Sequence, residues 1–359
     1  MIQRQTRRRA ATAAILGALI VLAGLGACEQ KAQQSGQTPA ADFGKRFKWK
    51  IQSLWQAGSI SQDVFVRWTE QVKAVTGGRL EIEPLPVGTV VAYNETVDAV
   101  GSGILDGVHG GGGYSAGKEV GFALITDLNA AYETPYQFQM WYEYEGGKEL
   151  AQELYNDFNM YFIGPVFWGA ESIPAKRPIR SIEEFRGVKL RSPEGMAQEI
   201  FRKIGAAPVN IPGSEVYTAL DRGVIEATDW GTLGMNEDLG YHKIAPFPIY
   251  PGIHSMPGTD VAVNLDRWNE LPPDIQAILE VTVRDFARDM IQTMEMVDRR
   301  VAAEAAGKGV TLVNWTPEAR KELREVAATV WKEYSARSEM GKKIYESQIA
   351  FLKKLGLID

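Results

Sequence analysis

The chain has 359 residues, of which 45% are hydrophobic and 23% are charged. These proportions are typical of a globular protein with one large core or two ordinary cores, and they exclude a largely disordered chain. The formal net charge is −6. Without the arginines near the N-terminus it becomes about −10, which argues against nucleic acid as a partner.

The N-terminus has the pattern of an export signal. The first 27 residues contain four arginines and no acid, and residues 10–26 form an apolar run that is short for a membrane-spanning helix. The run ends in Leu-Gly-Ala-Cys at residues 25–28, which resembles a lipobox. Cys28 is the only cysteine, so a redox or catalytic thiol is the alternative. We expect a signal peptide over 1–27, lipidation at Cys28 and a polar tether over 28–46.

The next segments predict the start of an α/β fold. Residues 47–55 alternate as a strand, residues 59–76 have the apolar periodicity of a helix, and residues 79–85 form a second strand. A short helix over 94–100 is followed by Gly-Ile-Leu-Asp-Gly at 103–107. A similar segment, Gly-Val-Ile-Glu-Ala, follows another predicted helix 120 residues later. This echo supports two domains built on one plan.

Four glycines at 110–113 precede Tyr114. A phosphate-binding loop is excluded because no Lys-Ser/Thr follows and the dinucleotide-binding spacing is absent. Aromatic and leucine residues within 133–161 predict two helices separated by a Gly-Gly pair. An apolar strand over 161–167 then leads to Glu171.

Residues 188–230 predict strand, helix, strand, helix, strand. The strands are expected at 188–191, 209–211 and 224–230, and Ser-Pro-Glu at 192–194 has the residues of a helix start. Crossovers of this kind force parallel strands.

Parallel strands would place Arg191 and the pair Asp229-Trp230 at carboxyl ends, where open α/β sheets bind ligands. The Arg191 guanidinium offers a planar fork for a carboxylate, and Trp230 offers a flat apolar wall. A surface arginine and a core tryptophan are the alternative. The sequence therefore indicates a site for a small acid.

The C-terminal third is mainly helical. A long helix is expected over 273–306, bounded by prolines and by Gly307. A strand over 310–315, a helix that starts at Thr-Pro-Glu 316–318 and a final amphipathic helix over 340–355 follow. The last helices would pack on one domain or on a second chain.

Three motifs around the predicted site resemble a known family: K-x-R-x-P at 189–193, I-G-A-x-P-V at 204–209, and Y-x-A-L-x-x-G-x-I-x-A-x-D-W at 217–230. They are similar to motifs in the solute-binding proteins of TRAP transporters, the tripartite ATP-independent periplasmic carriers. Residues 239–245 and 250–252 also resemble the subgroup that binds α-keto and hydroxy monocarboxylates. The segment Ile253-His254-Ser255 departs from that subgroup, which has bulky aromatics and an acid there.

The resemblance implies a bilobed α/β periplasmic binding protein, with two lobes joined by a hinge and a long spine helix. We expect lobe I to comprise residues 47–168 and 257–296. Lobe II would comprise residues 169–256 and 297–359.

The resemblance also implies a function without catalysis. The protein would be a periplasmic lipoprotein, monomeric or homodimeric, that captures a small organic acid and delivers it to the TRAP permease subunits. A secreted hydrolase is one alternative, although no G-x-S-x-G and no H-x-x-x-H spacing occurs. A chemosensory lipoprotein on the same fold is the other alternative.

The resemblance places five residues at the ligand: Arg191, Trp230, Tyr114, Asp229 and Trp55. If Glu171 and Asp229 both face the ligand carboxylate, three anions converge on one arginine. Either one carboxyl stays protonated or a metal ion bridges protein and ligand. A metal would be held by Glu171, Asp229 and the backbone at Trp230, and two acids favour calcium over sodium.

No cofactor is expected for chemistry. The alternative to the metal site is that Glu171 pairs with Lys176 or Arg177 outside the cleft.

Overall fold

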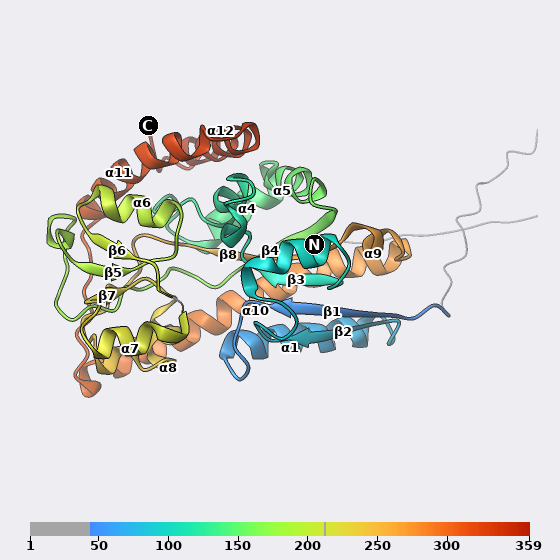
Figure 1. Cartoon of the computed structure of the whole chain (residues 1–359), viewed down its shortest axis with the longest axis horizontal. Helices are drawn as coiled ribbons and strands as arrows, with labels where there is room; N and C mark the ends of the chain where they lie inside the picture. The colour runs from blue at the N-terminus through green and yellow to red at the C-terminus, as the bar shows by residue number, and fades with distance from the viewer. Residues whose placement is uncertain (1–43, 212) are drawn as a thin grey trace, which may run out of the picture. The chain divides into compact units, whose positions relative to one another are not determined.

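A mixed five-stranded sheet and a parallel three-stranded sheet organise the fold (Figure 1). The computed structural model describes residues 44–211 and 213–359, which belong to one compact unit. The predicted signal peptide, Cys28 and tether residues 28–43 lie outside the described residues. Among the helices that the structure describes, none has the length and apolar character needed to cross a bilayer.

The larger sheet has the strand order β2-β1-β3-β8-β4. Strand β1 is parallel to β2 and β3, whereas β8 is antiparallel to both β3 and β4. Strands β1 and β2 confirm the two predicted N-terminal strands to within two residues. The five strands are β1 (Phe47–Ser53), β2 (Leu80–Leu85), β3 (Gly107–Gly110), β4 (Met160–Phe167) and β8 (Gly258–Asn264).

Helix α1 (Ile60–Val75) contacts β2. It begins after Ser59, whose side chain accepts a hydrogen bond from the backbone of Gln62, and it buries an apolar stripe that includes Phe65 and Trp68. The other helices of this part are α2 (Thr96–Gly101), α3 (Gly121–Thr126), α4 (Pro135–Tyr144), α5 (Gly147–Asn156) and α9 (Leu265–Asn269).

The smaller sheet has the order β6-β5-β7, and both of its strand pairs are parallel. It is formed by β5 (Lys189–Arg191), β6 (Ala207–Val209) and β7 (Ala227–Thr228), with α6 (Met196–Lys203) and α7 (Val216–Asp221) as crossovers. The predicted βαβαβ unit is therefore confirmed. The last strand is shorter than expected because Val224 and Ile225 both bond to the carbonyl of Ala219 in the turn after α7.

The predicted start of the helix after β5 is wrong. Helix α6 begins at Met196, after Gly195 with φ 119°, and no side chain caps it. The Ser192 hydroxyl instead donates to Oδ2 of Asp229 at 3.2 Å. A serine that bonds across the sheet edge is not available to cap a helix.

The 120-residue echo in the sequence is a structural repeat. Helices α2 and α7 differ by 120 residues at both ends, and Gly103 and Gly223 follow them with φ of 79° and 72°. In each copy the two residues after the glycine bond to one carbonyl, that of Ala99 or Ala219. The echo in the sequence therefore reflects a helix and turn that occur twice, and the domain boundaries stay a prediction.

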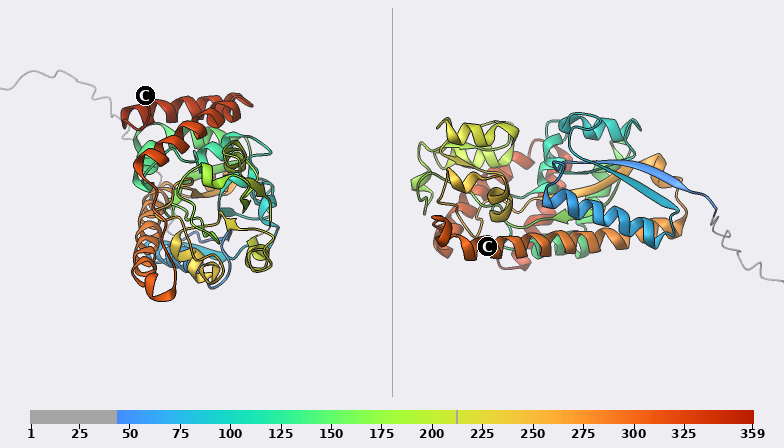
Figure 2. Two further views of the ribbon diagram at one scale, coloured as in Figure 1. Left: turned by 90° about the vertical axis from the view of Figure 1, so that its left-hand side faces the viewer. Right: turned by 90° about the horizontal axis from the view of Figure 1, so that it is seen from below.

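The long helix α10 (Pro273–Glu304) lies along the larger sheet and extends beyond it, as Figure 2 shows. It packs on β4 and α1 at the larger sheet, where Val283 contacts Gly164. Beyond that sheet it packs on α8 (Leu233–Asp238). There Oδ1 of Asp298 accepts hydrogen bonds from Thr232 Oγ1 and Gly234 N, each at 2.7 Å. One helix thus links the larger sheet to α8 and to the residues that precede it.

The last two helices, α11 (Pro317–Ser335) and α12 (Glu339–Lys354), pack on α6 and on α3 and α5, respectively, of the same chain. The predicted strand over 310–315 is wrong, because only Val313 forms a bridge, to Ile249. Thr311 and Val313 donate to the carbonyls of Pro246 and Pro248. Prolines have no N–H group with which to extend a ladder.

Candidate ligand and metal site

The structure brings Arg191 and Asp229 together at the carboxyl edge of the smaller sheet. The N–H of Asp229 donates to the Arg191 carbonyl at 2.9 Å. The Arg191 side chain is 5% exposed, and its Nε and Nη1 donate to the carbonyls of Ile211 and Asp229. Two of the five guanidinium N–H groups therefore fix the side chain, and others remain for a ligand.

Trp230 lies against this guanidinium, whose central carbon is 4.9 Å from the ring centroid. Gly213 packs against the benzo edge of the indole, and a Cβ at this glycine would lie 1.9 Å from Cη2 of Trp230. The tryptophan can occupy this position because residue 213 has no side chain. The ring supplies an apolar, cation-binding wall beside Arg191.

A buried cluster of three potential metal ligands adjoins Arg191. One side-chain ligand atom from each of Glu171, Asp229 and His254 lies within 4.8 Å of the others, and each residue is at most 7% exposed. The Nε2 atom of His254 lies 2.9 Å from Oδ1 of Asp229. His254 was not predicted as a site residue. The feature of the sequence that could have pointed to it is the departure from the monocarboxylate subgroup at residues 253–255.

The chain places Glu171 in the cluster through its backbone. Ser172 N donates to the Gly231 carbonyl at 2.9 Å, and Glu171 N donates to the Ser255 carbonyl at 3.0 Å. A Cβ at Gly252 would lie 2.2 Å from the Glu171 carbonyl oxygen, so only glycine allows this approach. Glu171 is therefore buried inside the site. The alternative, in which Glu171 pairs with Lys176 or Arg177 outside the cleft, does not agree with this position.

The two carboxyls of the cluster differ in their protonation. Burial raises the pKa of Glu171 well above its usual value, and the charge of Asp229 adds to this effect. Burial also opposes ionisation of Asp229, but His254 and Arg191 outweigh it and lower the pKa of Asp229 to about 2. The environment therefore favours the ionised form at Asp229 and the neutral form at Glu171.

A further buried acid, Asp127, contacts the residues that follow His254 and was not predicted. Its carboxylate accepts hydrogen bonds from Ser255 Oγ at 2.6 Å and Met256 N at 3.3 Å. Burial raises the pKa of Asp127 to about 7. This acid fixes the loop that carries His254, and the sequence holds no motif that marks it.

Tyr114 is carried by the short helix η2 (Gly112–Ser115). Half of its surface is exposed (51%), and its hydroxyl is close enough to Arg191, Glu171 and Asp229 for their charges to act on it. Although the residue as a whole is half exposed, its hydroxyl is surrounded by protein, which raises the pKa of Tyr114, and Arg191 opposes this change. The structure therefore brings this tyrosine to the cluster.

Trp55 follows strand β1 and is 9% exposed. Its Nε1 donates to Nε2 of His109 at 3.2 Å, so it has no N–H left for a ligand. Within residues 44–211 and 213–359, no hydrogen bond or ring contact links Trp55 to the Arg191 cluster. Its place at the ligand stays a prediction.

Comparison with known proteins identifies the family. Residues 51–338 match the model of bacterial extracellular solute-binding protein, family 7. The chain belongs to this family. The members are solute-binding proteins and not enzymes.

Three known proteins are similar to this family 7 protein in sequence or in structure. A monocarboxylate 2-oxoacid-binding periplasmic protein from Nostoc is 28% identical, covering 86% of this chain and 85% of the relative. An apo, open TRAP periplasmic solute-binding protein from Rhodobacter sphaeroides is 38% identical, with TM-score 0.75 and coverage of 86% and 99%.

A third, from Pseudoalteromonas atlantica, was solved with sodium and pyruvate bound. It is 26% identical, with TM-score 0.75 and coverage of 87% and 95%. The expected bilobed α/β fold is confirmed.

The residues of this family 7 protein suit a metal ion. Two carboxyls and an imidazole converge within 4.8 Å, and burial together with the charge of Asp229 raises the pKa of Glu171 well above its usual value. Carboxylate oxygens are the donors that Ca²⁺ and Na⁺ prefer, whereas the imidazole nitrogen of His254 is a donor of the kind that transition metals prefer. Glu171 and Asp229 were predicted as ligands, and the structure adds His254. Coordination by the Trp230 backbone stays a prediction.

Proposed function

We propose that this protein is the extracytoplasmic receptor of a TRAP transporter and captures a small organic acid of the α-keto or hydroxy carboxylate type. The observation that carries the proposal is the position of Arg191 at the carboxyl edge of the smaller sheet, beside a buried group of metal ligands. The Nostoc relative, by its name, binds monocarboxylate 2-oxoacids, and the Pseudoalteromonas structure holds pyruvate with sodium.

In this proposal Arg191 binds the ligand carboxylate with the N–H groups that its backbone contacts leave free. Trp230 and Tyr114 form the walls of the site, and Trp55 contributes from the opposite lobe. A metal ion held by Glu171, Asp229 and His254 would bridge protein and ligand. Two protein carboxylates and the ligand anion together exceed the single positive charge of Arg191. A bound cation would offset the remaining negative charge.

The charge count favours calcium over sodium. With both carboxyls ionised, the cluster and a ligand carboxylate carry three negative charges, and Arg191 supplies one positive charge. A divalent ion balances the remainder, whereas a monovalent ion leaves one excess anion in a buried site.

The lobe boundaries proposed from the sequence assign the larger sheet to lobe I and the smaller sheet to lobe II. The ligand would bind between them, and closure would exclude water and strengthen the arginine–carboxylate pair. The loaded protein would then deliver its ligand to the TRAP permease. Neither a hydrolase nor a chemosensory role gains support from the family or the relatives.

The test is a thermal-shift screen of mono- and dicarboxylates in calcium-containing buffer. A ligand present at about one hundred times its Kd adds roughly 2.7 kcal/mol of stability, which is readily measured. We expect pyruvate-like and 2-hydroxy acids to raise Tm and their amides to have no effect. A screen in which no carboxylate raises Tm would contradict the proposal.

Membrane anchoring through Cys28 is a separate part of the proposal, supported by the lipobox-like sequence at residues 25–28. The acyl chains and not the globular part would hold the protein to the membrane. We expect Cys28→Ser to release a soluble periplasmic protein. A variant that still fractionates with membranes would contradict lipidation.

A further inference from the structure

Asp260 is a buried acid that the proposed ligand site does not use. It lies in β8, between β3 and β4, and is 5% exposed. Within the described residues, neither of its carboxylate oxygens has a hydrogen-bond partner. Burial raises the pKa of Asp260 well above its usual value, and the backbone N–H groups of Asp260 and Gly110 only partly oppose this change. Neither backbone group makes a hydrogen bond of good geometry to the carboxylate, so this buried acid still lacks a full partner.

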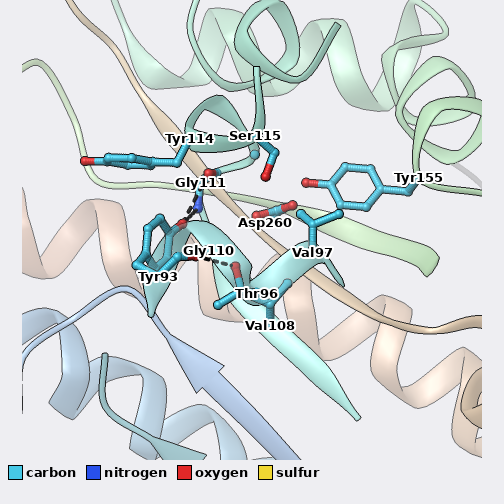
Figure 3. A pocket seen from close by; sticks show the side chains of 11 residues that line it. Tyr93, Thr96, Val97, Val108, Gly110, Gly111, Tyr114, Ser115, Tyr155 and Asp260 are labelled. Atoms are coloured by element: carbon cyan, nitrogen blue, oxygen red, sulfur yellow. Dashed lines mark hydrogen bonds between the residues drawn. The ribbon is translucent and has the colours of Figure 1, made fainter. Parts of the chain in front are cut away.

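The carboxylate of Asp260 lines a small cavity (Figure 3). The hydroxyls of Ser115 and Tyr155 point toward this carboxylate. The cavity leaves a volume of about 10 Å³ for the centre of a water molecule, which is room for one water-sized occupant. Tyr114 borders the cavity, but its hydroxyl points away from Asp260.

No residue that lines this cavity in the described part of the chain carries a positive charge. His109 is the nearest basic group on the neighbouring strand, and its Nδ1 lies 3.2 Å from the backbone carbonyl of Asp260. Burial lowers the pKa of His109 to about 3, so its ring is neutral. Tyr93 and Tyr142, the other titratable groups whose pKa values respond to Asp260, are neutral below their raised pKa values.

We propose that this cavity is a sodium site, with the Asp260 carboxylate and the hydroxyls of Ser115 and Tyr155 as ligands. All of these donors are oxygens, which hard cations prefer. The single acid balances one positive charge, whereas a divalent ion would leave an excess of charge in a buried site. The space for one water-sized occupant also excludes an ion that keeps its hydration shell.

An ion at Asp260 would act on the ligand site through η2. Ser115 and Tyr114 are neighbours in this helix, and the Tyr93 ring packs edge-on against Tyr114 at 4.8 Å. The Tyr93 hydroxyl also donates to the Gly111 carbonyl at 3.2 Å. Sodium would brace this segment and hold Tyr114 in place. This consequence rests on the proposed function, whereas the ion site does not.

The experiment measures Tm of the ligand-free protein in sodium, potassium or choline chloride at constant ionic strength. We expect sodium to raise Tm with a linear dependence on the logarithm of its concentration. The rise should persist in the double variant Glu171→Gln/Asp229→Asn, which disables the proposed ligand-site metal. It should be absent in Asp260→Asn and smaller in Tyr155→Phe. Asp298→Asn, another buried acid, is the matched control and should retain the response.

Two results would overturn the sodium site. One is a wild-type Tm that responds equally to the three salts, as a protonated Asp260 beside a water would give. The other is a response that disappears in the Glu171/Asp229 double variant and persists in Asp260→Asn, which would place the ion at the ligand site. If Asp260→Asn does not fold, an undiminished sodium response in Tyr155→Phe and in Ser115→Ala overturns the proposal. Loss of ligand binding alone would bear only on the proposed function.

Discussion

The imidazole of His254 hydrogen-bonds the carboxylate of Asp229 at 2.9 Å, and each residue is 2% exposed. The same carboxylate accepts the Ser192 hydroxyl at 3.2 Å. His254 and Arg191 lower the pKa of Asp229 against the effect of burial, whereas burial raises the pKa of Glu171. His254 thus helps to favour Asp229 as the charged acid of the cluster.

His254→Ala should therefore destabilise the protein by about 1–3 kcal/mol, because it leaves one oxygen of a buried carboxylate without its hydrogen-bond partner. It should also weaken ligand binding. His254→Gln retains an N–H donor and should recover part of the stability. Urea denaturation and calorimetry at pH 7 measure both effects. Equal stability of the alanine variant and the wild type would contradict a role for the pair.

Arg191→Ala should abolish measurable ligand binding and also lower stability by roughly 1.5–3 kcal/mol. The stability loss follows from the buried contacts of the guanidinium with Ile211 and Asp229. Arg191→Lys keeps the charge but not the planar fork, and should bind at least about tenfold more weakly than wild type. Calorimetric titration separates the variants. Unchanged affinity in Arg191→Lys would exclude recognition by the fork.

Treatment with a chelator should lower ligand affinity at least about tenfold, and calcium should restore it. The physical reason is that, with both carboxyls ionised, the cluster and the ligand anion carry three negative charges against the single positive charge of Arg191. Glu171→Gln provides the control, because it removes one negative charge from the proposed ligands while keeping an oxygen donor, and it should blunt the calcium response. Equal affinity with and without chelator, together with no metal in elemental analysis, would remove the ion and leave the arginine-centred site standing.

Gly213→Ala should weaken ligand binding about tenfold, because the new methyl group must displace the Trp230 ring. Gly117→Ala is a matched control, since a Cβ there meets no atom within 4 Å. Tryptophan fluorescence and calorimetry report ring position and affinity. If both variants bind equally well, the indole does not form a wall of the site.

The stability of the fold should depend on pH through Asp298. Burial raises the pKa of Asp298 from 3.8 to about 6, so its stabilising contribution is complete below 3.8 and is lost as pH rises through 6. The free energy of unfolding of Asp298→Asn, relative to that of the wild type, should rise by about 1–3 kcal/mol between pH 4 and pH 7. Asp289→Asn, a more exposed position on the same helix, should show no such change. Parallel denaturation curves at both pH values would contradict the assignment.

The amino-acid sequence by itself determined the elements whose signals are local. Ser59 and Thr316 cap helices at the predicted places, and the prolines at 272 and 273 mark the start of the long helix. The βαβαβ pattern required parallel strands, and that requirement placed Arg191 and Asp229 at one edge. These features depend on a few neighbouring residues, and no distant contact reverses them.

Only the tertiary structure decided which distant side chains share a site. His254 and Asp127 join Glu171 and Asp229 because loops far apart in sequence are pinned together, for example by the hydrogen bond between Glu171 N and the Ser255 carbonyl. The same long-range contacts overrode local patterns at Ser192, which bonds to Asp229 instead of capping a helix. Charge balance in a buried cluster depends on distances in space, and a local sequence pattern does not contain them.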